Sequence, residues 1–342
     1  MVQFNGPFGK VGPTYFRHGV RNPPAEPSKD FGGKTVVITG CNTGVGYEAA
    51  LKIAGLRPKK LILGTRTIAK GEATKTKILA QCPSLDKSVI EVLSIEYASF
   101  DSVVQFAESV KQSTQTLDCV LLSAGVAMPS YKPSEGGWEM ALKVNVLSAA
   151  LLAIELLPLL KNTPSSVLEF VGSVGHTHVT SEHVAPLIQD PSASTLAFFN
   201  SPDRWTVEKS YCEAKLLLMF VLEGLVESLG GSEGELAQPQ DPVLLACCPG
   251  QCKTDLGRDF PLTIRLFMKV WNSIMARSAD VGSRTLVTGL QQGEQANGRI
   301  WVNDAFDIRS PGLTETEWRA MQKRVWGEAV DVLKKYKPDL AI

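Results

Sequence analysis

The sequence lacks the features that would commit it to a metal, a disulfide framework, nucleic acid or a membrane. Only seven cysteines occur among 342 residues, and none has the spacing of paired metal ligands. Lysine plus arginine and aspartate plus glutamate both number 35, so no overall charge attracts the chain to nucleic acid or anionic lipid. The longest apolar run, 146–160, contains a glutamate and a proline and is too short to cross a bilayer. We therefore expect a small-molecule partner, no metal and no transmembrane segment.

The cysteines and histidines that are present predict structural positions. Cys247 and Cys248 are adjacent inside an apolar run, where they are expected to be small core residues. His176 and His178 have no cysteine or carboxylate arranged with them, which favours solvent-facing loop histidines over metal ligands. Free thiols without a recognisable signal peptide indicate a reducing compartment, and we expect a cytoplasmic protein.

Two regions differ in their sequence pattern. Residues 1–30 are rich in proline and have neither helical nor strand periodicity, which predicts an extended or disordered leader, although its aromatic residues could dock on the domain. In 31–342, short β-branched runs alternate with longer amphipathic stretches, as in a parallel sheet covered on both faces. We predict one α/β domain: a Rossmann-type, doubly wound, parallel seven-stranded sheet with helices on both faces. The expected strands are 35–38, 61–63, 89–95, 119–122, 167–171, 243–247 and 299–302, and the expected helices are 45–56, 68–81, 100–112, 137–160, 207–229, 279–291 and 315–335.

Ligands of such sheets bind at the carboxyl ends of the strands. Two segments leave that edge without fitting the alternation, 176–206 and 254–277, and both are placed to cover a substrate. Within the second, apolar residues recur at helical spacing over 261–276, with a few basic residues on other faces. That helix could close over a substrate as a lid or lie on a membrane surface; the balanced charge of the chain favours the lid.

A glycine-rich loop follows the first strand. In Thr39–Gly46, the glycines Gly40, Gly44 and Gly46 permit a tight turn and let the backbone approach a pyrophosphate at the N-terminus of the next helix. Because the loop lies between a strand and a helix near the start of the domain, it predicts a dinucleotide site. Arg66, twenty residues beyond Gly46, stands where an NAD enzyme would place a carboxylate. A guanidinium suits the 2′-phosphate of NADPH, although a solvated surface arginine is the alternative.

Tyr211 and Lys215 lie one helical turn apart in the expected helix 207–229. A phenol has a pKa of about 10, and a nearby ammonium favours the phenolate, so we expect the pKa of Tyr211 to be lowered. Such a tyrosine can protonate a carbonyl oxygen as a hydride arrives. Ser173 ends the fifth strand and could hydrogen-bond the substrate oxygen or cap a turn. Asn145 lies inside an apolar helix, where its amide either holds a water beside Lys215 or satisfies backbone groups.

Together these motifs resemble, in order, those of the short-chain dehydrogenase/reductase family over residues 34–305. The resemblance implies an Asn145, Ser173, Tyr211 and Lys215 tetrad, in which Tyr211 is the acid/base, Lys215 binds the nicotinamide ribose, Ser173 orients the carbonyl and Asn145 anchors a relay water. The motifs that carry it are Thr39-Gly-x-x-x-Gly44-x-Gly46, Ser123-Ala124-Gly125, Asn145, Ser173, Tyr211-x-x-x-Lys215 and Pro249-Gly250. The implied cofactor contacts are Gly40, Asn42, Thr43, Gly44, Val45, Gly46, Arg66, Glu96, Tyr97, Ser123, Ala124, Gly125, Tyr211, Lys215, Pro249, Gly250, Cys252 and Thr254.

The chain departs from the usual family pattern at a few positions. Ser123 replaces an asparagine, Glu96 an aspartate and Ser148 a glycine, and the gap from Ser173 to Tyr211 is long. The Gly64-Thr65-Arg66 turn, Ser173-x-x-His176 and the Arg277-Ser278-x-x-x-Gly282 stretch resemble the retinol-dehydrogenase-like branch, which favours NADP(H), and the leader and insert resemble reductases of fungal secondary metabolism. None of these departures removes a catalytic group.

The sequence therefore predicts an NADPH-dependent oxidoreductase that reduces a ketone or aldehyde of a fairly large apolar molecule, or oxidises the alcohol. The alternatives are a non-catalytic NADP-binding sensor or scaffold on the same fold and an enone reductase or epimerase of the same family. The family often pairs through the helices at 100–112 and 137–160, so either a homodimer or a monomer is expected.

Overall fold

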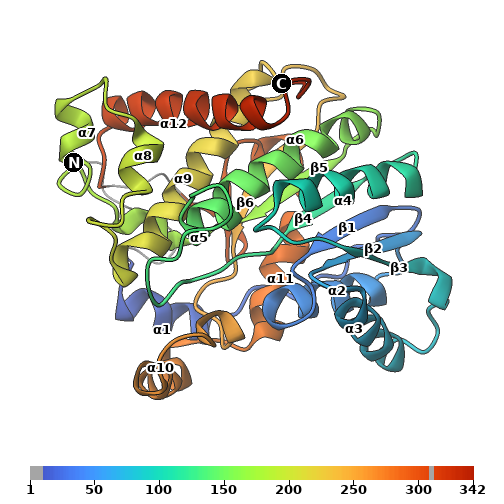
Figure 1. Ribbon diagram of the computed structural model, residues 1–342. Helices are drawn as coiled ribbons and strands as arrows, with labels where there is room; N and C mark the ends of the chain where they lie inside the picture. The colour runs from blue at the N-terminus through green and yellow to red at the C-terminus, as the bar shows by residue number, and fades with distance from the viewer. Residues whose placement is uncertain (1–10, 308–311) are drawn as a thin grey trace.

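One sheet organises the chain (Figure 1). In this computed structural model, which describes residues 11–307 and 312–342, eight strands lie in the order β3-β2-β1-β4-β5-β6-β7-β8. All neighbouring pairs are parallel except β7 and β8. The seven predicted parallel strands are confirmed. The strands are β1 (Thr35–Thr39), β2 (Lys60–Thr65), β3 (Ile90–Ser94), β4 (Cys119–Leu122), β5 (Val167–Val171), β6 (Val243–Cys248), β7 (Ile300–Val302) and β8 (Ala305–Asp307).

The eighth strand corrects the predicted strand number. β8 has three residues and returns antiparallel to β7 through a two-residue turn. Asn303 and Asp304 occupy that turn with φ of 51° and 63°, as a tight hairpin requires. A strand of three residues is too short to leave a periodic pattern in the sequence, so periodicity alone could not find it.

Helices cover both faces of the sheet (Figure 1). One layer packs on the face of the sheet to which Val36 and Ile38 of β1 contribute, and the other packs on the opposite face, to which Val37 contributes. The first layer is α2 (Gly44–Gly55), α3 (Ile68–Gln81) and α11 (Ala279–Gly289), and the second is α4 (Phe100–Ser113), α6 (Ser148–Lys161) and α9 (Val207–Ser228). A further long helix, α12 (Glu315–Tyr336), lies across α9 on the outside of the second layer. Shorter helical pieces are α1 (Pro13–Arg21), α5 (Met140–Leu142), α7 (Ala185–Gln189), α8 (Thr195–Phe199), α10 (Leu262–Met275), a π-helical turn Lys143–Leu147 and 3₁₀ turns at Lys87–Val89, Val174–His178, Asp255–Gly257 and Glu294–Ala296.

The most apolar helix is part of the core. Residues 140–161 are long and apolar enough to cross a membrane by composition alone, yet 94% of the apolar window is buried inside the protein. α6 packs between α4 and β5, and the π turn before it packs on α9. Its apolar surface is therefore used within the chain, and little remains for pairing with a second copy.

The leader is not simply extended. Residues 13–21 form α1, with a proline in its first turn, where a missing N–H costs nothing. Tyr15 and Gly19 are buried against the domain. The chain that follows is held by side chains: the main-chain N–H of Ala25 donates to Asp304 at 2.6 Å, and Glu26 pairs with Arg284 at 2.7 Å. The prediction of an extended or disordered leader is therefore wrong for 13–21, where docking of Tyr15 accompanies a helix, whereas 22–30 contain neither helix nor strand and run along the surface; 1–10 lie outside the described residues.

The long insert between β5 and α9 folds onto α12. The Glu328 carboxylate accepts hydrogen bonds from the main-chain N–H of Thr195 at 2.7 Å and of Leu196 at 2.8 Å, at the first turn of α8. Arg324 donates to the carbonyl of Leu187, the middle residue of α7, at 2.8 Å. The insert is thus fixed on its outer side by α12, while its end reaches the start of α9.

Candidate active site

The carboxyl ends of four central strands are level with one another. Thr39 pairs with Leu122, and Val171 pairs with Cys247, so the loops after β1, β4, β5 and β6 leave the sheet side by side. The strand order reverses between β1 and β4, and ligands of open α/β sheets bind at this switch point. Each of the four loops carries a predicted site motif.

The glycine loop after β1 fits tightly against the loop after β4. Gly40 has a φ of 68°, and a Cβ placed on it would lie 2.6 Å from the main-chain nitrogen of Ala124. A Cβ on Gly46 would lie 2.5 Å from the carbonyl oxygen of Gly40 and 2.8 Å from the Ser123 hydroxyl. No side chain fits at either position, because glycine is needed for the two loops to pack this closely beside the N-terminus of α2. Asn42, Thr43 and Val45, predicted with them, lie in this loop and the first turn of α2 and are not fully buried.

The segment after β6 returns to the same loop. Gly250 turns the chain with a φ of 72°, and the Cys252 thiol donates to the carbonyl of Pro249 at 3.2 Å. At the end of the segment, the Thr254 side chain lies 3.2 Å from the place where a Cβ on Gly44 would be. The structure therefore brings 249–254 together with the glycine loop, as the motif order predicts.

Arg66 and Glu96, both predicted to face the cofactor, are paired with each other. Arg66 follows β2, Glu96 follows β3, and the guanidinium Nε lies 3.0 Å from a Glu96 carboxylate oxygen. Within 11–307 and 312–342, the terminal nitrogens of Arg66 have no hydrogen-bond partner. Tyr97 is different: its buried hydroxyl meets the Thr39 hydroxyl at 2.8 Å, and its carbonyl accepts from Ser148 at 2.6 Å. Any contact of Tyr97 with a cofactor would therefore come from its main chain.

Tyr211, Ser173 and Lys215 meet at the ends of β5 and β6. The Ser173 hydroxyl accepts a hydrogen bond from the Gly175 N–H at 3.0 Å, which caps the turn after β5, and it lies close enough to the Tyr211 phenol to favour the phenolate. The Lys215 ammonium lies 5.6 Å from the centre of the Tyr211 ring and donates to the carbonyl of Val171 at 2.6 Å. The last carbonyl of β5 thus fixes the lysine, and the predicted triad of side chains is brought together.

Asn145 lies beside Lys215 and uses its amide on the main chain. It sits in the π-helical turn, a feature common at functional sites. Its Oδ1 accepts from the N–H of Val126 at 2.9 Å, and its Nδ2 donates to the Val126 carbonyl at 2.9 Å. A Cβ on Gly125 would lie 3.2 Å from the Asn145 Oδ1 and 4.0 Å from the Lys215 Nζ. Of the two roles left open by the sequence, the structure has the amide satisfying backbone groups.

Burial controls the protonation of the two central groups. It lowers the pKa of Lys215 from 10.5 to about 8. It raises the pKa of Tyr211 above its ordinary value, and the Ser173 hydroxyl offsets only part of that rise. The expected lowering of the Tyr211 pKa is therefore wrong for the protein alone, because desolvation of the phenolate outweighs favourable contacts. Tyr211 is held as a neutral acid able to donate its proton.

Two residues that sequence reasoning missed support this constellation. His176 is buried, not solvent-facing as predicted, and its Nδ1 lies 2.7 Å from the Ser173 carbonyl oxygen; burial lowers its pKa to about 4. Arg277 is also buried and donates to the Asn303 side chain at 2.8 Å, and its guanidinium lies 3.2 Å from where a Cβ on Gly250 would be. Both residues belong to motifs that resemble the retinol-dehydrogenase-like branch, but only tertiary contacts show that they are buried beside the site.

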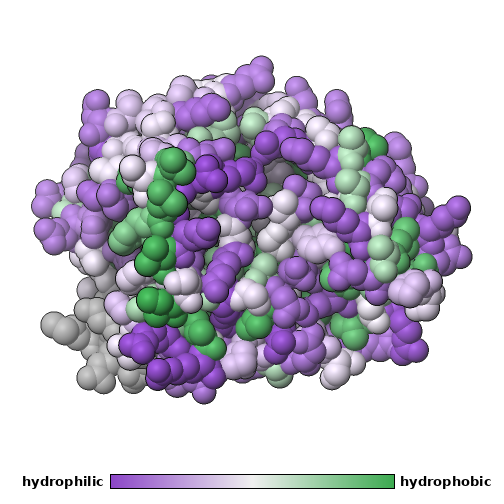
Figure 2. All heavy atoms as spheres, turned by 90° about the horizontal axis from the view of Figure 1, so that it is seen from below, coloured by the Kyte–Doolittle hydropathy of each residue, from purple (hydrophilic) through white to green (hydrophobic). Residues whose placement is uncertain are grey.

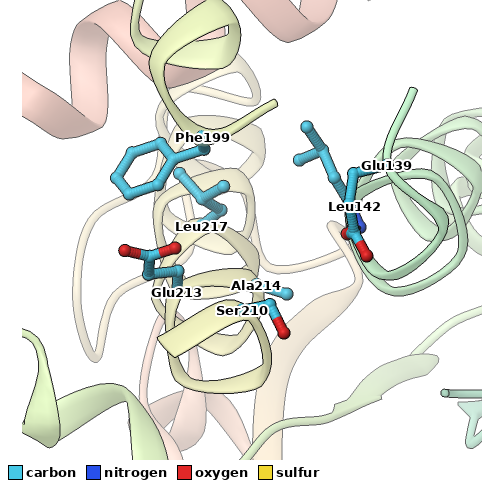
Figure 3. A pocket seen from close by; sticks show the side chains of 7 residues that line it. All are labelled: Glu139, Leu142, Phe199, Ser210, Glu213, Ala214 and Leu217. Atoms are coloured by element: carbon cyan, nitrogen blue, oxygen red, sulfur yellow. The ribbon is translucent and has the colours of Figure 1, made fainter. Parts of the chain in front are cut away.

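A small polar cavity lies on another side of α9 (Figure 3). Glu139, Ser210 and Glu213 line it together with apolar side chains, and its volume of about 10 Å³ has room for roughly one water. Glu213 pairs with Arg204 at 2.8 Å, and Asn200 accepts from the main-chain N–H of Glu139 at 2.6 Å. The cavity is too small for a substrate; it belongs to the polar network that fixes the end of the insert beside Tyr211.

The chain is similar to known dehydrogenases in sequence and in fold. A protein-family profile described as short chain dehydrogenase matches residues 34–185. Short-chain dehydrogenase sdnK of Sordaria araneosa is 55% identical over 98% of this chain and 100% of its own length. Short-chain dehydrogenase/reductase phmF of Phaeosphaeria nodorum is 37% identical over 97% of this chain and 95% of its own length. These matches extend well beyond the region covered by the profile.

Solved structures share the fold at lower identity. An uncharacterised protein from Mycobacterium paratuberculosis has a TM-score of 0.63 at 22% identity, covering 90% of this chain and 95% of its own. An NADPH-bound carbonyl reductase from chicken fatty liver has a TM-score of 0.57 at 17% identity, covering 81% of this chain and 99% of its own. At such identities the likeness concerns the sheet and its helical layers.

Proposed function

Because this chain belongs to the short-chain dehydrogenase/reductase family and is therefore an oxidoreductase, we propose that it uses NADPH to reduce a ketone or aldehyde of a fairly large apolar molecule. The observation that carries the proposal is the contact of Ser173 with Tyr211 beside a buried Lys215 at the carboxyl edge of the sheet. The retinol-dehydrogenase-like resemblance supports the use of NADPH, and the resemblance of the leader and insert, together with the fungal relatives, supports a role in fungal secondary metabolism.

The residues fit a dinucleotide. Gly40 and Gly46 let the glycine loop pack closely on the β4 loop, and the N-terminus of α2 that follows would favour the charge of a pyrophosphate through the helix dipole. Arg66 has its terminal nitrogens available for a 2′-phosphate, and the Pro249–Thr254 segment lies within reach of the same loop. When bound, NADPH would supply the hydride that adds to the carbonyl carbon.

Tyr211 then supplies the proton. Its raised pKa keeps it protonated near neutral pH, so the phenol can donate to the carbonyl oxygen as negative charge develops there. One C–H bond and one O–H bond form, the carbonyl π bond breaks, and Tyr211 is left as a phenolate. The Ser173 hydroxyl lies beside the phenol and can donate a hydrogen bond to the substrate oxygen, which would hold the carbonyl against the acid.

Lys215 stabilises the phenolate. The ammonium is charged below its pKa of about 8 and lies one helical turn from Tyr211, anchored by the Val171 carbonyl. A positive charge in a buried site stabilises a nearby anion far more than it would in water. Asn145 holds the β4 loop through Val126 and so keeps the wall beside Lys215 in place.

Replacing Tyr211 by Phe tests the proposal. The change removes one hydroxyl, so we expect NADPH binding to be retained while turnover of ketones falls on the order of 10²- to 10⁴-fold, the usual general-acid contribution. Tyr336→Phe, which removes a hydroxyl at the end of α12, is the matched control and should keep activity. A panel of ketones and enones with NADPH identifies the reaction type, and wild-type turnover by Tyr211→Phe would overturn the mechanism.

A further inference from the structure

The helix after the Pro249–Thr254 segment leaves an apolar face uncovered. α10 contributes no fully buried residue, although its side chains are mostly apolar. Five of them are each 55–67% exposed and lie at spacings that place them on one side of the helix. They are Leu262, Leu266, Phe267, Val270 and Ile274, and they are named the α10 strip.

The strip points away from the domain. The last turn of α10 contacts the chain on its other side: Trp271 and Met275 are partly buried, and Asn272 accepts a hydrogen bond from Gln251 at 3.0 Å, whereas 261–270 are exposed throughout. Seen from below, where α10 is the lowest helix of Figure 1, a run of hydrophobic residues crosses the surface (Figure 2). In this arrangement the strip does not contact the site and is open to an outside partner.

The charges around the strip all have one sign on the two helices concerned. α10 contains Arg265 and Lys269 and no acid, and both cations lie on the helix next to the Leu262 side of the strip. α1 packs beside α10 and also contains no acid, while Arg17 and Arg21 are exposed on it. An apolar strip bordered by cations is the pattern of a helix that lies in the interface of an anionic membrane.

A second copy of the chain fits this surface less well. A strip of five side chains on one short helix offers on the order of 500 Å², against about 800 Å² per partner in a stable complex. Symmetric pairing would also bring the cations of both copies together. A lipid surface has neither drawback, because it accepts a convex helix and carries the opposite charge.

We propose that α10, with the basic residues of α1 beside it, docks the protein on the surface of a membrane that contains anionic lipid. The docking helix is joined directly to the predicted nicotinamide segment: Gln251 donates to Asn272, and Cys252 pairs with Arg277 just beyond the helix. An apolar substrate dissolved in the bilayer would then reach the site from the membrane side. That consequence rests on the proposed function; the docking itself does not.

Vesicle sedimentation of the full chain tests the docking. With phosphatidylcholine vesicles that contain phosphatidylserine, we expect binding that weakens at high salt, and much weaker binding to phosphatidylcholine alone. Leu266→Glu/Phe267→Glu should abolish binding, and Arg265→Glu/Lys269→Glu should lower it by about 25-fold or more, since each of the two cations near an anionic surface contributes about a fivefold factor.

Matched control variants show whether an effect on vesicle binding is specific to the α10 strip or follows from any change of surface charge. Ile68→Glu places a charge on another exposed apolar residue, and Lys323→Glu/Lys334→Glu reverses two exposed cations on α12. Both should bind vesicles like the wild type. Thermal unfolding of every variant checks that it is folded. Equal binding by Leu266→Glu/Phe267→Glu and wild type would overturn the proposal.

Hydrogen exchange distinguishes the other possible occupants of the strip. Protection of 262–275 by anionic vesicles, without cofactor or substrate, supports docking. Protection by NADPH and a water-soluble ketone, with none from vesicles, means that the helix is a lid and overturns the proposal. A lipid-free dimer that Leu266→Glu/Phe267→Glu dissociates, with no vesicle binding by the wild type, assigns the strip to a second copy and also overturns it. None of these readouts depends on turnover, so a failed carbonyl-reductase assay would leave them interpretable.

Discussion

Cofactor preference should depend on Arg66, and the structure sets the size of the effect. A charge-assisted hydrogen bond contributes about 1.5–3 kcal/mol. The Arg66 side chain is 53% exposed and already holds Glu96 through its Nε, so water and the carboxylate both compete with a phosphate. The lower end of the range therefore applies, and Arg66→Ala should weaken NADPH binding about tenfold, which corresponds to roughly 1.4 kcal/mol.

Glu96 provides the second arm of this test. Its carboxylate lies 3.0 Å from the Arg66 Nε and would also lie near a bound 2′-phosphate. Two like charges a few ångströms apart in water repel by less than about 1 kcal/mol, so Glu96→Gln should tighten NADPH binding roughly two- to threefold. The same change should leave NADH binding nearly unchanged, because NADH carries no phosphate at that position.

Titration of cofactor fluorescence with wild type and variants measures both effects. Arg299→Ala, which breaks an exposed ion pair with Glu233 elsewhere on the surface, is the control and should alter neither affinity. The reasoning predicts that NADPH binds more tightly than NADH and that only this difference shrinks in Arg66→Ala. A wild-type preference for NADH, or an equal loss of both affinities in Arg66→Ala, would refute it.

Two further predictions follow from buried positions. Gly46→Ala should abolish cofactor binding or destabilise the fold, because its Cβ would lie 2.5 Å from the Gly40 carbonyl oxygen; cofactor titration and thermal unfolding check this. The His176 pKa is lowered from 6.5 to about 4, so below pH 6.5 the unfolded chain binds the proton first and stability is lost as pH falls toward 4. The loss, on the order of 3 kcal/mol, should disappear in His176→Phe when denaturant unfolding is measured across that range; an unchanged pH slope would contradict it.

The strands and the reacting helix could be predicted because their signals are local. A buried parallel strand is a short apolar run, and the seven such runs correspond to β1–β7. Tyr211 and Lys215 are four residues apart, so they are neighbours in any helix that contains both, and predicting the helix was enough to predict their proximity. The glycine loop was equally clear, since its spacing reflects a backbone that must approach its neighbour at Ala124.

What the sequence could not predict depends on contacts between distant segments. His176 is buried because its segment packs under α12 beside Trp318, 142 positions along the chain. α1 is ordered because Tyr15 is buried against a core formed by later elements. The pKa of Tyr211 is raised in the protein without cofactor, although the sequence predicted a lowered value. The prediction considered the charge of the nearby ammonium, whereas the dominant effect is desolvation by the surrounding protein.

The polar side chains of the candidate site are anchored mostly to the main chain near the strand ends. Lys215 is held by the last carbonyl of β5, Asn145 by Val126 just after β4, and His176 by the carbonyl of Ser173. The first of these anchors belongs to the sheet, and the other two lie in the loops directly after β4 and β5. The main-chain groups that hold Lys215 and Asn145 lie outside the leader, the insert before α9 and the α10 region, whereas the insert is fixed beside Tyr211 by the Arg204–Glu213 pair. Substrate choice and membrane contact would reside in those segments, and the reaction in the sheet.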